Sequence, residues 1–182
     1  MKKALLVIDY TVDFVAENGA LTCGIPGQKL ENSILKHIMQ FAEQEELIIF
    51  ACDLHEENDL YHPETKLFPP HNIRNTKGRE LYQNVQKWYK ENNGLSNVIW
   101  MDKTRYSSFA GTNLEQILRE RNINDIYLTG VCTDICVLHT AVDAYNKGFN
   151  TFIFKDSVAS FNEAGHVWAM EHFKNTLGAT IL

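Results

Sequence analysis

Six short apolar runs, separated by stretches of helical periodicity, constrain the fold of this 182-residue chain more than any other feature. Two of them, 4–8 and 47–51, are almost continuously apolar, as expected of strands buried on both faces. The other predicted strands are 98–101, 126–129, 151–154 and 179–182. Alternating strands and helices form right-handed crossovers. The sequence therefore predicts a three-layer α/β/α fold with a mostly parallel, six-stranded central sheet.

Helical periodicity fills most of the intervals between these runs. Apolar residues three and four positions apart predict helices over 30–46, 112–121, 138–147 and 163–175, with weaker helical character over 75–91. The interval 53–97 interrupts the alternation of strands and helices, and it holds three of the four prolines. Long loops inside compact domains are usually functional. We expect a single domain over 1–182, with a functional loop insertion at about 53–97.

The composition argues against several classes of protein. A net charge of −6 does not suggest a nucleic-acid or anionic-membrane partner. The first apolar run ends at Asp9, too early for a secretory leader, and no run approaches the roughly 20 apolar residues of a membrane span. The cysteines are too scattered for a disulfide framework; they are Cys23, Cys52, Cys132 and Cys136. We expect a cytoplasmic protein, and the sequence is compatible with a homo-oligomer.

The segment Gly130-Val131-Cys132-Thr133-Asp134-Ile135-Cys136-Val137 places two cysteines where a buried strand passes into a helix. A helix N-terminus carries unpaired N–H groups and about half a positive charge, so a cysteine there can be a nucleophile with a lowered pKa. A redox pair and a metal clip are the other interpretations of two cysteines one helical turn apart. Thr133 and Asp134 are predicted to cap the helix.

Polar residues follow the ends of the predicted strands, where ligands bind in open parallel sheets. Asp9 follows the first strand, Asp53 the second and Lys103 the third, and Cys136 follows the fourth. A carboxylate can take the thiol proton, an ammonium can stabilise both anions, and the sulfur can attack a carbonyl. Taken singly, Asp9 is as well explained as a turn or cap residue, and Lys103 as a surface residue.

Together these motifs resemble the isochorismatase-like cysteine hydrolases and, within them, the nicotinamidases, also called pyrazinamidases. The resemblance is carried, in chain order, by 8–14, Asp53-Leu54-His55, His71, Lys103 and the 130–137 hinge. It implies that Cys136 is the nucleophile and that Asp9 is the general base and later the general acid. It also implies that Lys103 holds Asp9 and Cys136 in position relative to each other. It also implies a cis peptide bond before Cys132, with the backbone N–H groups of Cys132 and Cys136 forming an oxyanion hole.

The resemblance further implies a metal site in the loop after the second strand. A carboxylate and two imidazoles, from Asp53, His55 and His71, suit one divalent ion, most typically Zn²⁺, with Mn²⁺ and Fe²⁺ as alternatives. Some family members place a further ligand in this stretch, where Glu64 lies. His62 is interpreted as a surface or loop histidine. In nicotinamidases the pyridine nitrogen of the substrate binds this metal, which orients the amide toward the sulfur.

Three aromatic residues, Phe14, Phe68 and Tyr106, flank these positions and are predicted to form the walls of a pocket for a flat substrate. Each of them singly is equally well explained as a core residue. The implied activity is hydrolysis of nicotinamide to nicotinate and ammonia through a cysteine thioester, in NAD salvage, with pyrazinamide as another substrate. The alternatives are another small-amide or ureido amidohydrolase of the superfamily and a non-catalytic small-ligand binder. The intact catalytic set argues against the binder.

Overall fold

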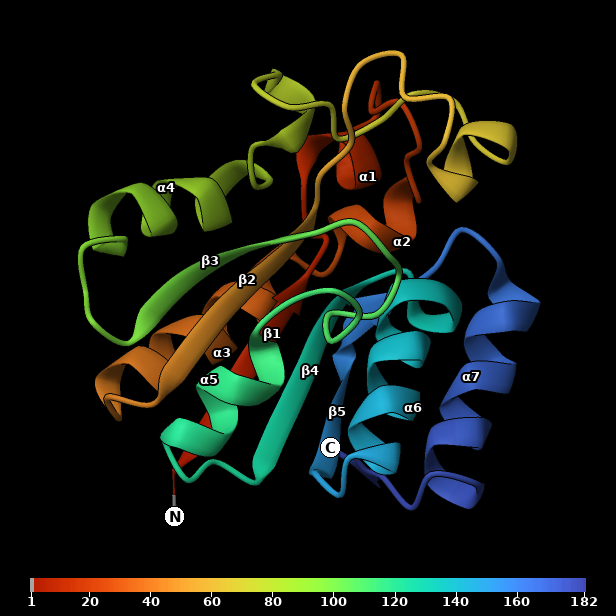
Figure 1. Ribbon diagram of the computed structural model, residues 1–182. Coiled ribbons are helices and arrows are strands. Elements are labelled where there is room, and N and C mark those ends of the chain that lie inside the picture. Colours follow the sequence, from red (N-terminus) through yellow and green to blue (C-terminus); the bar gives the residue numbers. More distant parts are fainter. Residues whose placement is uncertain (1) are drawn as a thin grey trace.

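A single six-stranded sheet forms the centre of the computed structural model, which describes residues 2–182 (Figure 1). All neighbouring strands are parallel, in the order β3-β2-β1-β4-β5-β6. The strands are β1 (Lys3–Ile8), β2 (Leu47–Asp53), β3 (Val98–Lys103), β4 (Asp125–Val131), β5 (Asn150–Ala159) and β6 (Thr180–Ile181). The predicted fold is confirmed.

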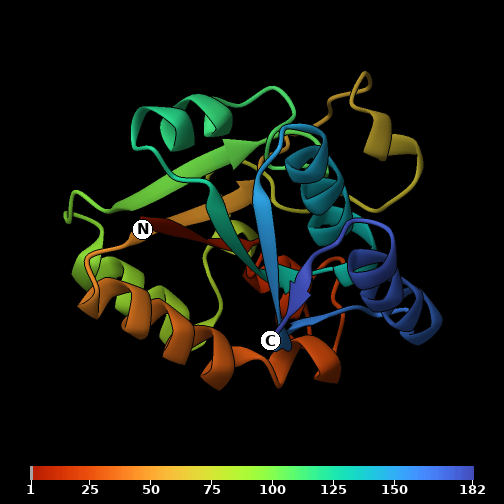
Figure 2. The same cartoon turned by 90° about the horizontal axis from the view of Figure 1, so that it is seen from below.

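Helices cover both faces of the sheet (Figure 2). The longer ones are α3 (Glu31–Glu43), α4 (Gln83–Asn92), α5 (Leu114–Glu120), α6 (Leu138–Asn146) and α7 (Glu163–Asn175). Helices α5, α6 and α7 pack with Leu6 and Ile8 of β1 on one face, whereas α3 and α4 pack with Leu5 and Val7 on the other. Successive strand residues face opposite sides. Both faces of β1 are therefore buried, which explains its continuous apolar run.

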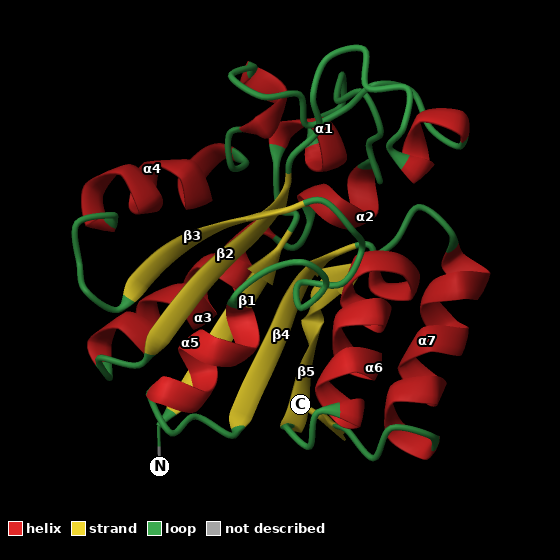
Figure 3. Cartoon of the chain, in the orientation of Figure 1, coloured by secondary structure: helices red, strands yellow, loops and turns green. Residues whose placement is uncertain are grey.

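The irregular segments gather above the carboxyl ends of the strands (Figure 3). They contain helices too short for any periodicity to predict, namely α1 (Val12–Val15), α2 (Ile25–Gln28) and the 3₁₀ helices Pro63–Lys66 and Lys77–Arg79. The weak helical signal over 75–91 corresponds to the second 3₁₀ turn followed by α4. Among residues 2–182, no helix has the length and apolar character needed to cross a membrane.

Candidate functional site

The hinge between β4 and α6 brings both cysteines to the carboxyl edge of the sheet. The peptide bond before Cys132 is cis, as the resemblance implied, and a π-helical turn, Thr133–Val137, carries Cys136. Gly130 has φ +109°, and a Cβ on it would overlap the carbonyl oxygen of Ile8 on the neighbouring strand. Only glycine fits there. The hinge geometry thus depends on a residue without a side chain.

The helix cap predicted at this hinge is wrong. Among residues 2–182, no side chain caps the π-helical turn. The Thr133 hydroxyl instead lies 2.8 Å from Nδ1 of His166 on α7. The Asp134 carboxylate lies against Gly165, also on α7, where a Cβ would overlap its oxygen. Both side chains therefore join the hinge to the neighbouring helix.

The structure brings Asp9, Lys103 and Cys136 together at the ends of β1, β3 and the hinge. Nζ of Lys103 lies 2.7 Å from Oδ2 of Asp9 and 2.6 Å from Oδ1 of Asp53, and all three side chains are at most 1% exposed. The Asp53 backbone N–H donates to Oδ1 of Asp9 at 2.7 Å. Sγ of Cys136 and one oxygen from each carboxylate lie within 4.8 Å of one another. A thiol, a base and a cation thus share one buried site.

Burial dominates the electrostatics of this group. Burial and the charge of Asp53 raise the pKa of Asp9 to about 6, although Lys103 opposes the shift. Burial alone would lower the pKa of Lys103, but Asp53 and Asp9 outweigh it and raise that pKa. Burial likewise disfavours the Asp53 carboxylate, yet Lys103 keeps its pKa below the ordinary value. Near neutral pH the site therefore holds a lysine cation between two carboxylates.

The lowered pKa expected for the nucleophilic cysteine is wrong. Burial raises the pKa of the Cys136 thiol well above its ordinary value, and the attraction of Lys103 does not offset this. The side chain is 5% exposed, so a thiolate would lose nearly all its hydration. Cys136 therefore rests as a thiol and has to transfer its proton before it can attack, and the Asp9 carboxylate is placed to accept that proton.

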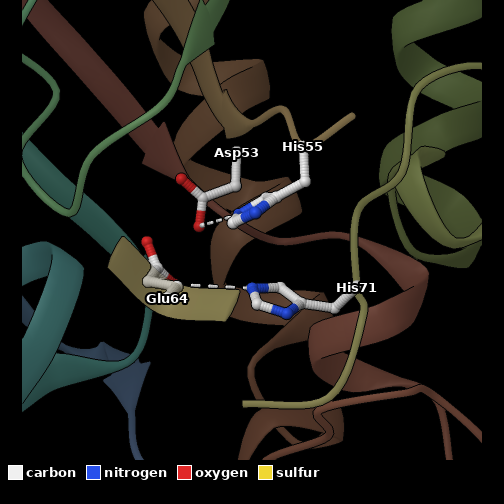
Figure 4. Close-up of side chains that lie close together, drawn as sticks. All are labelled: Asp53, His55, Glu64 and His71. Atoms are coloured by element: carbon white, nitrogen blue, oxygen red, sulfur yellow. Dashed lines mark ion pairs between the residues drawn. The ribbon is translucent and has the colours of Figure 1, made fainter. Parts of the chain in front are cut away.

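Four side chains converge at the end of β2 and in the segment that follows it (Figure 4). Asp53, His55, Glu64 and His71 are all buried, and one donor atom from each lies within 4.8 Å of the others. Within the described residues, Nε2 of His55, Nε2 of His71 and Oδ2 of Asp53 have no hydrogen-bond partner. Unpaired buried polar atoms are unfavourable, so their convergence fits a bound cation. The three predicted ligands and Glu64 are thus brought together.

Hydrogen bonds orient the histidines of this segment. Nδ1 of His71 donates to the Pro69 carbonyl at 2.8 Å, which leaves the lone pair of Nε2 facing Glu64, 3.6 Å away. Burial opposes protonation of His71, but Glu64 and the Pro69 carbonyl outweigh it and raise the pKa, so this cluster attracts positive charge. His62 is buried rather than at the surface. It accepts from the Glu64 backbone N–H at 3.2 Å and lies 2.8 Å from the Thr104 carbonyl oxygen, so both its nitrogens are engaged elsewhere.

A small cavity lies beside the cysteine and reaches two of the four converging side chains, Asp53 and Glu64. It is lined by Phe14, Leu21, Asp53, Glu64, Phe68, Tyr106, Cys132, Ile135, Cys136 and Phe161. All three aromatic residues predicted as pocket walls are among them. Its free volume is about 20 Å³, far below that of an open ligand pocket, so the lining side chains would have to move apart to admit a ligand. The aromatic lining, rather than the volume, is what suits a flat molecule.

Three lining residues had no role in the sequence prediction. Ile135 directly precedes Cys136 and could have been found from its place in the hinge. Phe161 was missed because the fifth strand was predicted to end at 154, whereas β5 continues to Ala159 and places Phe161 beyond a strand end. Leu21 lies in an irregular segment between α1 and α2, where no sequence pattern indicated it.

Comparison with known proteins agrees with this geometry. Residues 3–182 match the isochorismatase domain family. The chain is 55% identical over 181 residues to PncA of Bacillus subtilis strain 168, named as an uncharacterized isochorismatase family protein, covering 100% of this chain and 99% of that protein.

Among solved structures, the nicotinamidase/pyrazinamidase PncA from Bacillus subtilis superposes with a TM-score of 0.98 at 56% identity, covering 100% of this chain and 99% of that one. The pyrazinamidase/nicotinamidase from Streptococcus mutans UA159 gives 0.97 at 48%, covering 100% of both chains. The pyrazinamidase of Pyrococcus horikoshii in complex with zinc gives 0.86 at 28%, with coverages of 100% and 99%. From its sequence and its fold, this chain belongs to the isochorismatase family.

Proposed function

We propose that this protein is a nicotinamidase that hydrolyses nicotinamide to nicotinate and ammonia, with pyrazinamide as another substrate. The observation that carries the proposal is the buried Asp9–Lys103–Cys136 group, whose cysteine lines a small aromatic cavity together with Asp53 and Glu64 of the candidate metal ligands. The relatives named nicotinamidase and pyrazinamidase support it. The enzyme would act in cytoplasmic NAD salvage as one domain over 1–182, with the insertion at 53–97 supplying metal ligands.

The first half of the reaction forms a thioester. Asp9 takes the proton of the Cys136 thiol, and Sγ attacks the carboxamide carbon. The backbone N–H groups of Cys132 and Cys136 stabilise the negative charge that develops on the substrate oxygen. Asp9 then returns the proton to the departing nitrogen, the C–N bond breaks, and ammonia leaves. Throughout, Lys103 compensates the charge of the base while the proton moves.

The second half releases the acid. Asp9, again a carboxylate, takes a proton from a water molecule as that water attacks the thioester carbon. The C–S bond breaks, the sulfur of Cys136 regains a proton from Asp9, and nicotinic acid departs and ionises to nicotinate in water. The same carboxylate thus alternates between base and acid, a role that suits a pKa of about 6 near neutral pH.

Asp53, His55 and His71, together with Glu64, would hold one divalent ion, with Zn²⁺ as the first choice and Mn²⁺ or Fe²⁺ as alternatives. The zinc complex of the Pyrococcus horikoshii pyrazinamidase supports that choice. When bound, the ion would supply a Lewis acid that binds the pyridine nitrogen of the substrate. Phe14, beside His71 with ring centroids 5.2 Å apart, would form one wall for the substrate ring.

The test is ammonia release from nicotinamide, with Zn²⁺, Mn²⁺ or Fe²⁺ supplied. We expect turnover by the wild type, none by Cys136→Ala, and near wild-type turnover by Cys23→Ser, which keeps a donor to the Phe14 carbonyl. A wild-type enzyme that releases no ammonia with any of these ions would reject the nicotinamidase assignment. Ammonia release from other small amides would then favour another amidohydrolase of the family.

A further inference from the structure

Asp13, on α1, forms a hydrogen bond with the backbone next to His71, one of the four converging side chains. Its Oδ2 accepts a hydrogen bond from the backbone N–H of Asn72 at 2.8 Å, and its Oδ1 accepts one from the Ala20 N–H at 3.3 Å. Asn72 directly follows His71. Asp13 itself lies outside the group of four converging side chains. Its carboxylate therefore acts on that group through the main chain.

The Asn72 peptide connects both histidines of that group. Its N–H donates to Asp13, and its carbonyl oxygen accepts from the His55 N–H at 3.1 Å. The His55 carbonyl in turn accepts from the Arg74 N–H at 2.9 Å. A displacement of Asn72 would consequently move His71 through the covalent chain and His55 through the hydrogen bond.

Asn72 also adopts a conformation that its surroundings have to hold. Its φ is +46°, in the left-handed region that side chains disfavour, and the residue is fully buried. Among the described residues, neither polar atom of its side chain has a hydrogen-bond partner. The Asn72 side chain therefore makes no local bond that stabilises this backbone, whereas the Asp13 carboxylate does.

The segment around Gly78 leaves room for the Asp13 carboxylate. A Cβ placed on Gly78 would overlap both carboxylate oxygens of Asp13. Gly78 has no positive φ that would otherwise call for glycine. Its missing side chain is thus explained by the carboxylate that lies against it.

We propose that Asp13 is a positioning residue for the metal centre, which fixes the Asn72 peptide and thereby the two imidazoles. The inference rests on the metal site of the proposed function and extends it to a residue that does not contact the ion.

The experiment measures Zn²⁺ affinity without substrate, by competition with a chromophoric chelator. We expect Asp13→Ala to weaken binding about tenfold or more, as removal of groups that orient metal ligands commonly does. Asp13→Asn keeps an acceptor for the Asn72 N–H and should lose less. Gly78→Ala, which displaces the carboxylate without removing it, should also weaken binding. Glu17→Ala removes the same charge from a nearby exposed side chain and should bind as the wild type does.

Circular dichroism of the metal-free variants reports folding, and if Asp13→Ala does not fold, Asp13→Asn and Gly78→Ala carry the test. Visible absorption of the Co²⁺-loaded proteins reports ligand arrangement, and we expect an altered spectrum for Asp13→Ala even at saturating Co²⁺. Affinity within twofold of wild type for the folded Asp13 and Gly78 variants would overturn the proposal, as would an equal loss in Glu17→Ala.

The zinc measurement also separates this inference from the proposed reaction. Normal zinc binding without ammonia release would reject the nicotinamidase function and leave the role of Asp13 standing. A wild-type protein that binds no zinc would reject the metal site and this inference together.

Discussion

Replacing Lys103 with methionine in the metal-free protein removes one ammonium that lies 2.7 Å and 2.6 Å from the carboxylates of Asp9 and Asp53. Breaking a buried ion pair by removing one partner costs about 3–5 kcal/mol. Here one cation serves two carboxylates and all three side chains are at most 1% exposed. We therefore expect the free energy of unfolding to fall by about 4–5 kcal/mol at pH 8.

The penalty should depend on pH in a defined direction. The pKa of Asp9 is about 6 with Lys103 present, above its ordinary 3.8, and loss of the cation raises it further. A carboxyl whose pKa is raised by folding stabilises the folded state most below its unfolded pKa and loses that contribution as pH rises. The difference between wild type and variant should therefore be smaller at pH 6 than at pH 8.

Urea unfolding in EDTA, followed by circular dichroism at both pH values, measures these differences. The matched control is Lys147→Met, which breaks an ion pair of 2.7 Å with Glu115 in which the lysine side chain is 34% exposed. Solvent screens that pair, so its loss should be far smaller and nearly independent of pH. The reasoning is refuted if Lys103→Met is no less stable than the control, or if its penalty is equal at pH 6 and pH 8.

Three further predictions concern catalysis and the hinge. Chelation, or His71→Ala, should raise KM for nicotinamide while iodoacetamide alkylates Cys136 at close to the wild-type rate; unchanged turnover of metal-free enzyme would exclude the role of the ion. Because protonated Asp9 cannot accept the thiol proton, kcat/KM should fall as pH drops through about 6; an acidic limb centred below pH 5 in the pH–rate profile would contradict this. Gly130→Ala should cost at least about 3 kcal/mol in urea unfolding, because its Cβ would overlap the Ile8 carbonyl at a φ of +109°. A loss below about 1 kcal/mol there would show that the hinge adapts.

The sheet was predictable because its strands are buried on both faces and therefore read as uninterrupted apolar runs. The same rule that places ligands at strand ends located Asp9, Asp53, Lys103 and Cys136 without any knowledge of contacts. It failed for β5, which continues through exposed polar residues that end the apolar pattern, and so Phe161 was missed.

Other features depend on tertiary contacts that no sequence pattern encodes. The position of Cys136 at the start of a helical turn indicated a lowered pKa, but burial reverses the shift. Thr133 and Asp134 have the composition of helix caps, yet they contact α7 instead. Only the family resemblance pointed to Glu64, and its carboxylate meets the two predicted histidine ligands through contacts that form when the chain folds.

Asp53 and Lys103 are register partners on β2 and β3, and this has a consequence for how such a sequence can diverge. Side chains alternate between the two faces of a strand, so a single residue inserted within β3 would turn Lys103 to the opposite face. Loops at the amino ends of the strands, away from the site, are not subject to this constraint and can change length. Insertions and deletions should therefore survive in those loops, whereas the strands that carry site residues tolerate substitution of one apolar residue by another but no change in residue number.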